Sequence, residues 1–291
     1  MSEQYVATAL ARFRYARTGT GPPVLLLPGS GGWRLTFHTM AAVLAERHTV
    51  LALDPPGQGL TEVLDPDFGY DTDAIARSIA AFLDAVGLDR AAIVGHSWGG
   101  GFALRFAQLY PGRADRLALL QPGGLEVKDL WEFRLLRLPV IGELAVRLTS
   151  TASVRHLLRK FFVHRERIPD ALIDEVVAEL RSGPNRAARL ADLLRVERSV
   201  SWADTEAELP LVRAPVLLLW GEQDRYYPAR LMKRFMARLP TVEPYLLTGC
   251  GHSLHDDCPE QTYPLLVPFL ANTNGARAHS SRRCSCSADS R

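Results

Sequence analysis

Residues 91–102 read A-A-I-V-G-H-S-W-G-G-G-F and join a short apolar run to a segment that is compatible with a helix. This order predicts a strand, a sharp turn with Ser97 at its apex, and a helix. A serine in so tight a turn has a strained backbone, and its Cβ crowds the residues two before and two after it. Gly95 and Gly99 occupy those positions and have no side chain to clash. An ordinary turn with an incidental serine has the same pattern, so residues elsewhere in the chain must decide between the two interpretations.

Chain length and composition restrict the class of protein. The 291 residues, 47% of them hydrophobic and 23% charged, are enough for one large α/β domain with an inserted subdomain. The net charge of +2 argues against a dedicated nucleic-acid-binding protein. No run of about 18 apolar residues is present, and the first residues do not resemble a secretory signal. We therefore expect a cytoplasmic protein with neither nucleic acid nor a membrane as a partner.

The four cysteines lie near or after the end of the predicted fold, at Cys250, Cys258, Cys284 and Cys286. They lack a histidine pair at the spacing of metal ligands, and they are too few for a disulfide framework. We expect no metal site, no cofactor and no disulfide framework. Residues 272–291 are rich in Ser, Arg and Ala without apolar periodicity, and this composition predicts a disordered tail.

Apolar runs alternate with helical patterns along most of the chain, as in an α/β protein. Continuous apolar runs predict buried parallel strands at residues 24–27, 49–53, 116–120, 214–220 and 242–247. Between residues 121 and 210 such runs disappear and helical patterns replace them. We expect a core of residues 1–121 and 211–271, with residues 122–210 forming a helical cap over the strand ends.

A glycine-rich loop, residues 28–33, follows the first of these strands. Such a loop could cradle a phosphate, but it lacks a lysine and the spacing G-x-x-x-x-G-K-[ST]. Beside a nucleophilic serine the loop has another use. The backbone N–H of Ser30 would pair with that of Trp98 to form an oxyanion hole.

Ser97, Asp224 and His252 each follow a different predicted strand, so their side chains are expected at one carboxyl edge of a parallel sheet. This order, with the motifs P-G-S-G-G, G-H-S-W-G-G, W-G-E-Q-D and G-C-G-H, resembles the α/β-hydrolase family over about residues 24–270. The resemblance implies a mostly parallel eight-stranded sheet flanked by helices, with an inserted helical cap. It also implies a catalytic triad in which Ser97 is the nucleophile, His252 the base and Asp224 the residue that orients the base.

Two features depart from the usual family pattern. Pro28-Gly29 stands where His-Gly is common. The G-H-x-W-G elbow and residues 138–143 look like those of haloalkane dehalogenases and epoxide hydrolases, which attack with an aspartate. Because this chain has Ser97 at that position, we expect acyl transfer rather than an alkyl-ester intermediate.

Other histidines and acids compete for the same roles. His255 lies three residues after His252, and His96 precedes the serine, where it is expected to pack inside the elbow. Glu222 is a carboxylate two residues before Asp224. The position after the preceding strand, which some relatives use for the acid, is Gln121, and Asp54 is expected to pin a loop.

Substrate contacts are expected from glycines of the loop and from large side chains around the predicted site, although core packing explains most of them equally well. They are Gly29, Gly31, Trp33, Trp98, Trp131, Phe133, Phe161, Phe162, Tyr226, Tyr227 and Leu254. Such an apolar pocket suits a small ester, lactone or thioester, and a serine esterase is the main hypothesis. A carbon–carbon bond hydrolase, a natural-product thioesterase or cyclase, and a cofactor-free haloperoxidase-like enzyme use the same triad.

A non-hydrolytic ligand-binding or cyclisation scaffold that retains the triad is the alternative from another class. Basic residues cluster between Arg155 and Arg167, where a solvated helix face or an acyl-carrier-bound substrate would account for them. We expect a monomer or homodimer that acts on a small molecule.

Overall fold

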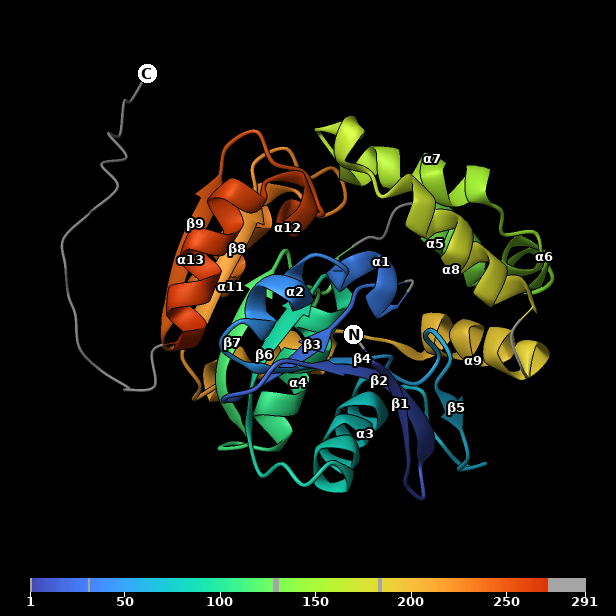
Figure 1. Ribbon diagram of the computed structural model, residues 1–291, viewed down its shortest axis with the longest axis horizontal. Coiled ribbons are helices and arrows are strands. Elements are labelled where there is room, and N and C mark those ends of the chain that lie inside the picture. Colours follow the sequence, from blue (N-terminus) through green and yellow to red (C-terminus); the bar gives the residue numbers. More distant parts are fainter. Residues whose placement is uncertain (1, 31, 128–130, 183–184, 272–291) are drawn as a thin grey trace.

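The computed structural model describes residues 2–30, 32–127, 131–182 and 185–271 (Figure 1). Its centre is one sheet with the strand order β1-β2-β4-β3-β6-β7-β8-β9, and β5 pairs with β2. The strands are β1 (Ser2–Ala7), β2 (Ala11–Thr18), β3 (Pro23–Leu27), β4 (Thr49–Leu53), β5 (Glu62–Val63), β6 (Ala91–His96), β7 (Ala114–Leu120), β8 (Val216–Gly221) and β9 (Val242–Leu247). Neighbours from β4 to β9 are parallel, whereas β2 is antiparallel to β1, β4 and β5. The mostly parallel eight-stranded sheet is confirmed, and β5 adds a short strand that the sequence pattern did not indicate.

Helices cover both faces of the sheet because its central strands are apolar on both sides. In β3, Leu25 and Leu27 join the core on one face, while Val24 and Leu26 join the core on the other. The first face packs against α3 (Thr72–Ala85), α4 (Trp98–Leu109) and α11 (Met232–Met236), which follows η3 (Ala229–Leu231). The second packs against α1 (Trp33–Phe37), α2 (Met40–Ala45), α12 (Leu254–Asp257) and α13 (Pro259–Ala271).

The segment between β7 and β8, called the helical insertion below, contains helices and loops but no strand among its described residues. Its helices are α5 (Trp131–Leu136), α6 (Ile141–Arg147), α7 (Thr151–Phe161), η1 (Arg165–Arg167), α8 (Asp170–Ser182), α9 (Arg186–Ser199), α10 (Ala203–Ala207) and η2 (Leu209–Leu211). Figure 1 shows α5 to α9 beside the sheet, with α6 at their outer end. The inserted helical region that the loss of strand-like runs predicts is therefore present.

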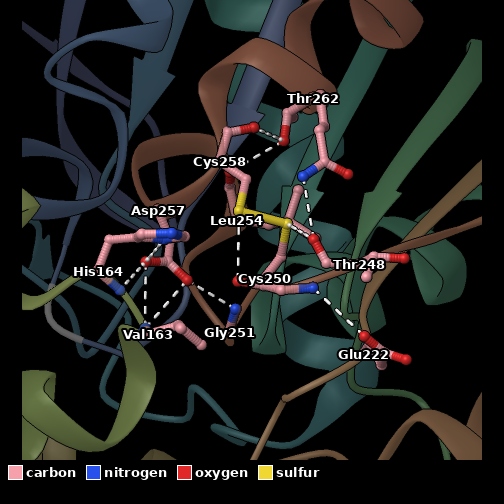
Figure 2. The surroundings of a disulfide bond; sticks show 12 residues. Val163, His164, Glu222, Thr248, Cys250, Gly251, Leu254, Asp257, Cys258 and Thr262 are labelled. Carbon is pink, nitrogen blue, oxygen red and sulfur yellow. Dashed lines mark hydrogen bonds and ion pairs between the residues drawn. A yellow bond between two sulfur atoms is a disulfide. The ribbon is translucent and has the colours of Figure 1, made fainter.

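Cys250 and Cys258 form a disulfide bond, with their Cα atoms 5.9 Å apart (Figure 2). The expectation drawn from the cysteine count is wrong for this pair. The reason is that α12 turns the chain back on itself, and the spacing of the two cysteines does not reveal that turn. Cys284 and Cys286, like the whole predicted tail, lie outside the described residues.

In the part of the chain that the structure describes, no helix has the length and apolar character needed to cross a bilayer. The cytoplasmic location expected from the sequence stays a prediction.

Candidate active site

Ser97 occupies the turn between β6 and α4. Its backbone angles, φ 52° and ψ −124°, lie in a region that non-glycine residues rarely adopt. A Cβ added to Gly99 would lie 2.0 Å from the carbonyl oxygen of Leu27, and one added to Gly95 would lie 2.6 Å from the Cα of Gly100. Only glycine tolerates these close approaches, and the crowding atoms belong to the backbone of Leu27 and Gly100 instead of the side chain of Ser97.

Asp224 and His252 meet through a buried hydrogen bond. Nδ1 of His252 lies 2.8 Å from Oδ2 of Asp224, and neither side chain is more than 1% exposed. The other carboxylate oxygen accepts the backbone N–H groups of Tyr226 at 2.7 Å and Tyr227 at 2.9 Å. Because Nδ1 faces a carboxylate, that nitrogen carries the proton, and Nε2 is left to accept one. Ser97 lines the same cavity as His252, although these two described side chains form no hydrogen bond with each other.

The acids and amides that compete with Asp224 have other contacts. Glu222 is exposed, and its carboxylate accepts the backbone N–H of Gly249 at 3.3 Å. Gln121 is fully buried, and its side-chain amide donates to the carbonyl of Gly251, the residue directly before the histidine. Gln121 therefore supports the loop that carries the expected base.

Asp54 holds a loop together, in agreement with the expectation from the sequence. Its fully buried carboxylate accepts hydrogen bonds from the Arg14 guanidinium at 2.9 Å and from the backbone N–H groups of Leu60 at 3.0 Å and Trp33 at 3.2 Å. Burial raises the pKa of Asp54, and the charge of Arg14 opposes that shift.

Two further histidines pack beside His252. Nε2 of His96 donates to the backbone carbonyl of His252 at 2.9 Å, and the ring of His96 also contacts that of His255. Burial lowers the pKa of His96 well below its ordinary value, and burial also lowers the pKa of His255. These rings are therefore neutral near pH 7 and add no charge to the site.

A narrow cavity of about 60 Å³ lies over Ser97. The sheet edge and its loops contribute Gly29, Ser30, Leu35, Thr36, His96, Ser97, Trp98, Tyr226, His252, Ser253 and His255. The helical insertion contributes Phe133, Leu157, Leu158, Phe161, Phe162 and Pro169, all of them apolar. The cavity is thus polar at its catalytic wall and apolar where the insertion covers it.

Six of the eleven predicted contact residues line this cavity, namely Gly29, Trp98, Phe133, Phe161, Phe162 and Tyr226, and so does Ser30, which was predicted for the oxyanion hole. Three others lie elsewhere. The ring of Trp33 packs on Arg14, and Trp131 is 61% exposed. Leu254, the first residue of α12, is fully buried in the core. Tyr227 is buried behind the cavity, with its ring 5.6 Å from that of His252. Gly31 lies outside the described residues.

Several lining residues were not singled out from the sequence. Leu157 and Leu158 precede Phe161 by four and three positions on α7, so one face of this helix lines the cavity. The spacing of residues 157, 158 and 161 on one helix face could have indicated them from the sequence.

The residues expected to form an oxyanion hole lie beside the serine. A Cβ added to Gly29 would lie 3.0 Å from the Cβ of Ser97, so the loop before Ser30 passes next to Ser97. Trp98 is the first residue of α4, where N–H groups have no partner within the helix. This placement is compatible with the expected role of both N–H groups.

The loop that carries His252 is fastened to the helical insertion by a buried carboxylate, Asp257 (Figure 2). Asp257 accepts the backbone N–H of Gly251 at 2.6 Å, that of His164 at 2.7 Å and that of Val163 at 3.1 Å. The Cys250–Cys258 disulfide closes the same loop. Sequence analysis missed Asp257 because two of its three partners lie 93 and 94 positions away in the chain.

One group of described side chains has atoms of the kind that bind metals. His164, Asp257 and Cys258 bring such atoms within 4.8 Å of one another. However, the sulfur of Cys258 is bonded to Cys250, and both oxygens of Asp257 accept N–H groups. These atoms are already engaged in holding the loop.

The chain is similar to a family of known proteins and to several solved structures. The model of a family described as "alpha/beta hydrolase fold" matches residues 22–259. The chain is 27% identical over 260 residues to a 2-hydroxy-6-oxo-6-phenylhexa-2,4-dienoate hydrolase of Burkholderia cepacia, covering 87% of this chain and 89% of the relative. A solved bacterial membrane phospholipase A is 28% identical, with a TM-score of 0.75 over 94% of this chain and 87% of that one. A meta-cleavage product hydrolase from Pseudomonas fluorescens has the same fold, with a TM-score of 0.76 and 23% identity over 93% of this chain and 98% of that one.

Proposed function

The chain belongs to the α/β hydrolase fold family and is a serine hydrolase, and on this premise we propose that it hydrolyses a carbon–carbon bond next to the carbonyl of a small ketone. The similarity to the dienoate hydrolase over most of both chains carries this proposal. It reverses the order of the two hypotheses drawn from the sequence, in which ester hydrolysis came first and carbon–carbon cleavage was the alternative.

The proposed reaction begins when Oγ of Ser97 attacks the carbonyl carbon while Nε2 of His252 takes the hydroxyl proton. The negative charge that develops on the carbonyl oxygen is stabilised by the N–H groups of Ser30 and Trp98. Each such donor lowers the activation barrier by roughly 3 kcal/mol. Asp224 keeps the histidine in the required tautomer and stabilises it when it is positively charged.

Bond cleavage then transfers the electron pair to the departing carbon, and His252 returns the proton to that fragment. The acyl group remains on Ser97 as an ester. A water molecule that His252 deprotonates releases it as a carboxylic acid. Cleavage is easiest when the departing carbanion is conjugated with a second carbonyl, as in a vinylogous diketone.

Ester hydrolysis is the second candidate, because the same steps apply with an alkoxide as the leaving group. One observation favours it over cleavage of a dienoate. The substrate named for the Burkholderia relative is a dienoate, and the described residues that line the cavity include no lysine or arginine to pair with such a carboxylate. Burying an unpaired charge is costly, so an uncharged ketone or ester suits this cavity better than a dienoate anion.

The first test is the intact mass of the protein after incubation with a fluorophosphonate, for the wild type and for Ser97→Ala. We expect one adduct on the wild-type protein, mapped to Ser97, and none on the variant. A wild-type protein that stays unlabelled yet binds ligands would instead favour the non-hydrolytic scaffold. The second test compares turnover of an aryl vinylogous diketone, its carboxylate analogue and a matched aryl ester. Faster turnover of the ester than of both diketones would assign the enzyme to the esterases.

A further inference from the structure

A row of large apolar side chains faces solvent on the helical insertion. Twelve large hydrophobic side chains are exposed in the described part of the chain, and six of them fall within residues 131–148. These six are Trp131, Leu138, Val140, Ile141, Leu144 and Leu148, and the exposed fraction reaches 73% at Leu148. Exposed apolar residues normally occur singly on a soluble protein, so this concentration requires an explanation.

The pattern arises from the way α6 packs. Its buried face consists of Gly142 and Val146, and a Cβ added to Gly142 would lie 2.3 Å from the carbonyl oxygen of Leu136. This close contact fixes the orientation of α6 against the end of α5. The opposite face, with Ile141, Leu144 and Leu148 at spacings of three and four, is therefore held toward solvent. Figure 1 shows α6 at the outer end of the insertion, away from the sheet.

Arginines lie in the segment before α6 and on the buried side of this helix, which carries Val146. A groove of about 500 Å³ between α6 and α9 is lined by the side chains of Arg147, Arg186, Arg195 and Arg198 and by a single acid, Glu143. Glu143 pairs with Arg198 at 2.8 Å and Asp192 pairs with Arg195 at 2.9 Å, so the net positive charge of the groove comes from Arg147 and Arg186. Arg134 and Arg137, between the six apolar side chains in the sequence, are also exposed.

We propose that the α6 face, defined as Leu138, Val140, Ile141, Leu144 and Leu148 with the exposed arginines Arg134, Arg137 and Arg147, docks the protein on an anionic lipid surface. An amphipathic helix binds such a surface by inserting its apolar side chains between the lipids while arginines pair with the headgroups. The charge pattern favours this occupant over a second copy of the chain. A two-fold interface through the α6 face would bring these exposed arginines of two copies together, and like charges oppose association.

This inference changes an expectation from the sequence. The described residues contain no helix long and apolar enough to cross a membrane, but this finding says nothing of a helix that lies on the surface of a membrane. The inference is independent of the proposed reaction, and Ser97→Ala is expected to bind lipid as the wild type does.

The test is co-sedimentation with vesicles of phosphatidylcholine containing phosphatidylglycerol, and with vesicles of phosphatidylcholine alone. We expect clear binding to the anionic vesicles and at least about tenfold weaker binding to the neutral ones. The double variant Leu144→Ser/Leu148→Ser should lose about tenfold or more in affinity for the anionic vesicles. Arg147→Glu should weaken binding to the anionic vesicles only.

Matched controls lie in the segment that leads into β8. Leu211 is 55% exposed and Arg213 is also exposed, so Leu211→Ser and Arg213→Glu make the same chemical changes away from the α6 face. Both controls should bind like the wild type. The proposal is overturned if the α6 variants bind as well as the controls do, or if the wild type does not bind vesicles. Sedimentation velocity tests the alternative occupant. A wild-type dimer that becomes monomeric in Leu144→Ser/Leu148→Ser, from a protein that does not bind vesicles, would assign the α6 face to a second copy of the chain.

Discussion

The backbone N–H of His252 donates a hydrogen bond of 2.7 Å to the backbone carbonyl of Phe161, at the end of α7. The expected base and a wall of the cavity are thus joined directly. A Cβ added to Gly251 would lie 2.3 Å from the same carbonyl oxygen, so the glycine before the histidine permits this contact. Together with Asp257, the contact makes the position of the base depend on the position of the helical insertion.

The triad assignment predicts large losses of turnover. Ser97→Ala and His252→Ala should each lower kcat by about a thousandfold or more, and Asp224→Asn should be comparably damaging because the histidine loses its orienting carboxylate. Glu222→Gln is the matched control, since this exposed carboxylate contacts Gly249 instead. Steady-state kinetics measure all four variants. Full activity in Asp224→Asn, with a loss in Glu222→Gln, would reverse the assignment of the acid.

Asp257→Asn tests the connection between the insertion and the base. An amide retains the shape of the carboxylate but turns an NH₂ group toward backbone N–H donors, so the fully buried site loses hydrogen bonds. We expect the free energy of unfolding to fall by about 1–3 kcal/mol. We also expect labelling of Ser97 by fluorophosphonate to slow, because Gly251 and the histidine after it are released.

The control for Asp257→Asn is Glu260→Gln, in which an exposed carboxylate that pairs with Arg167 is changed in the same way. Its labelling rate and stability should match those of the wild type. Unchanged labelling in Asp257→Asn, despite lower stability, would restrict Asp257 to a structural role.

The disulfide should add stability that a reducing agent removes. Closing the short loop between Cys250 and Cys258, eight positions apart, limits the unfolded chain and is worth about 2–3 kcal/mol in a chain-entropy model. Urea unfolding with and without dithiothreitol measures this difference. The double variant Cys250→Ala/Cys258→Ala should unfold at lower urea and should not respond to the reductant. A wild-type unfolding curve that is the same with and without dithiothreitol would show that the disulfide bond does not form.

Stability should fall below neutral pH because His96 and His255 are buried. Burial lowers the pKa of both rings in the folded protein below the ordinary value of 6.5. Above pH 6.5 both states hold neutral rings, whereas below it the unfolded chain binds protons that the folded chain does not. The free energy of unfolding therefore decreases as the pH falls, by up to about 1.4 kcal/mol per pH unit for each histidine.

Chemical denaturation between pH 8 and pH 5 measures this slope. His96→Asn should have a shallower slope than the wild type, by up to one proton. His156→Asn, at an exposed position on α7, should leave the slope as it is. Equal slopes for all three proteins would mean that His96 does not contribute to the pH dependence of the free energy of unfolding.

Local sequence was sufficient wherever the physical cause is local. The continuous apolar runs of β3 and β4 predicted these strands because a strand buried on both faces must be apolar throughout. Gly95 predicted the turn for a local reason, because the backbone of Gly99 and Gly100 leaves no room for a Cβ there, whereas the crowding at Gly99 comes from the distant Leu27. The expectation that Ser97, Asp224 and His252 lie at one edge of the sheet followed from the rule that parallel strands end at the same edge.

Tertiary structure alone decided the features that depend on residues far apart in the chain. Asp257 binds N–H groups from a loop 93 and 94 positions away, and Trp33 turns toward Arg14 instead of the cavity. The same holds for the exposed face of α6. Its apolar spacing is that of an ordinary buried helix, and only the packing of Gly142 and Val146 against the insertion shows that Leu144 and Leu148 are left facing solvent. A hydrophobic pattern records which side chains avoid water, but not which of them the fold has space to bury.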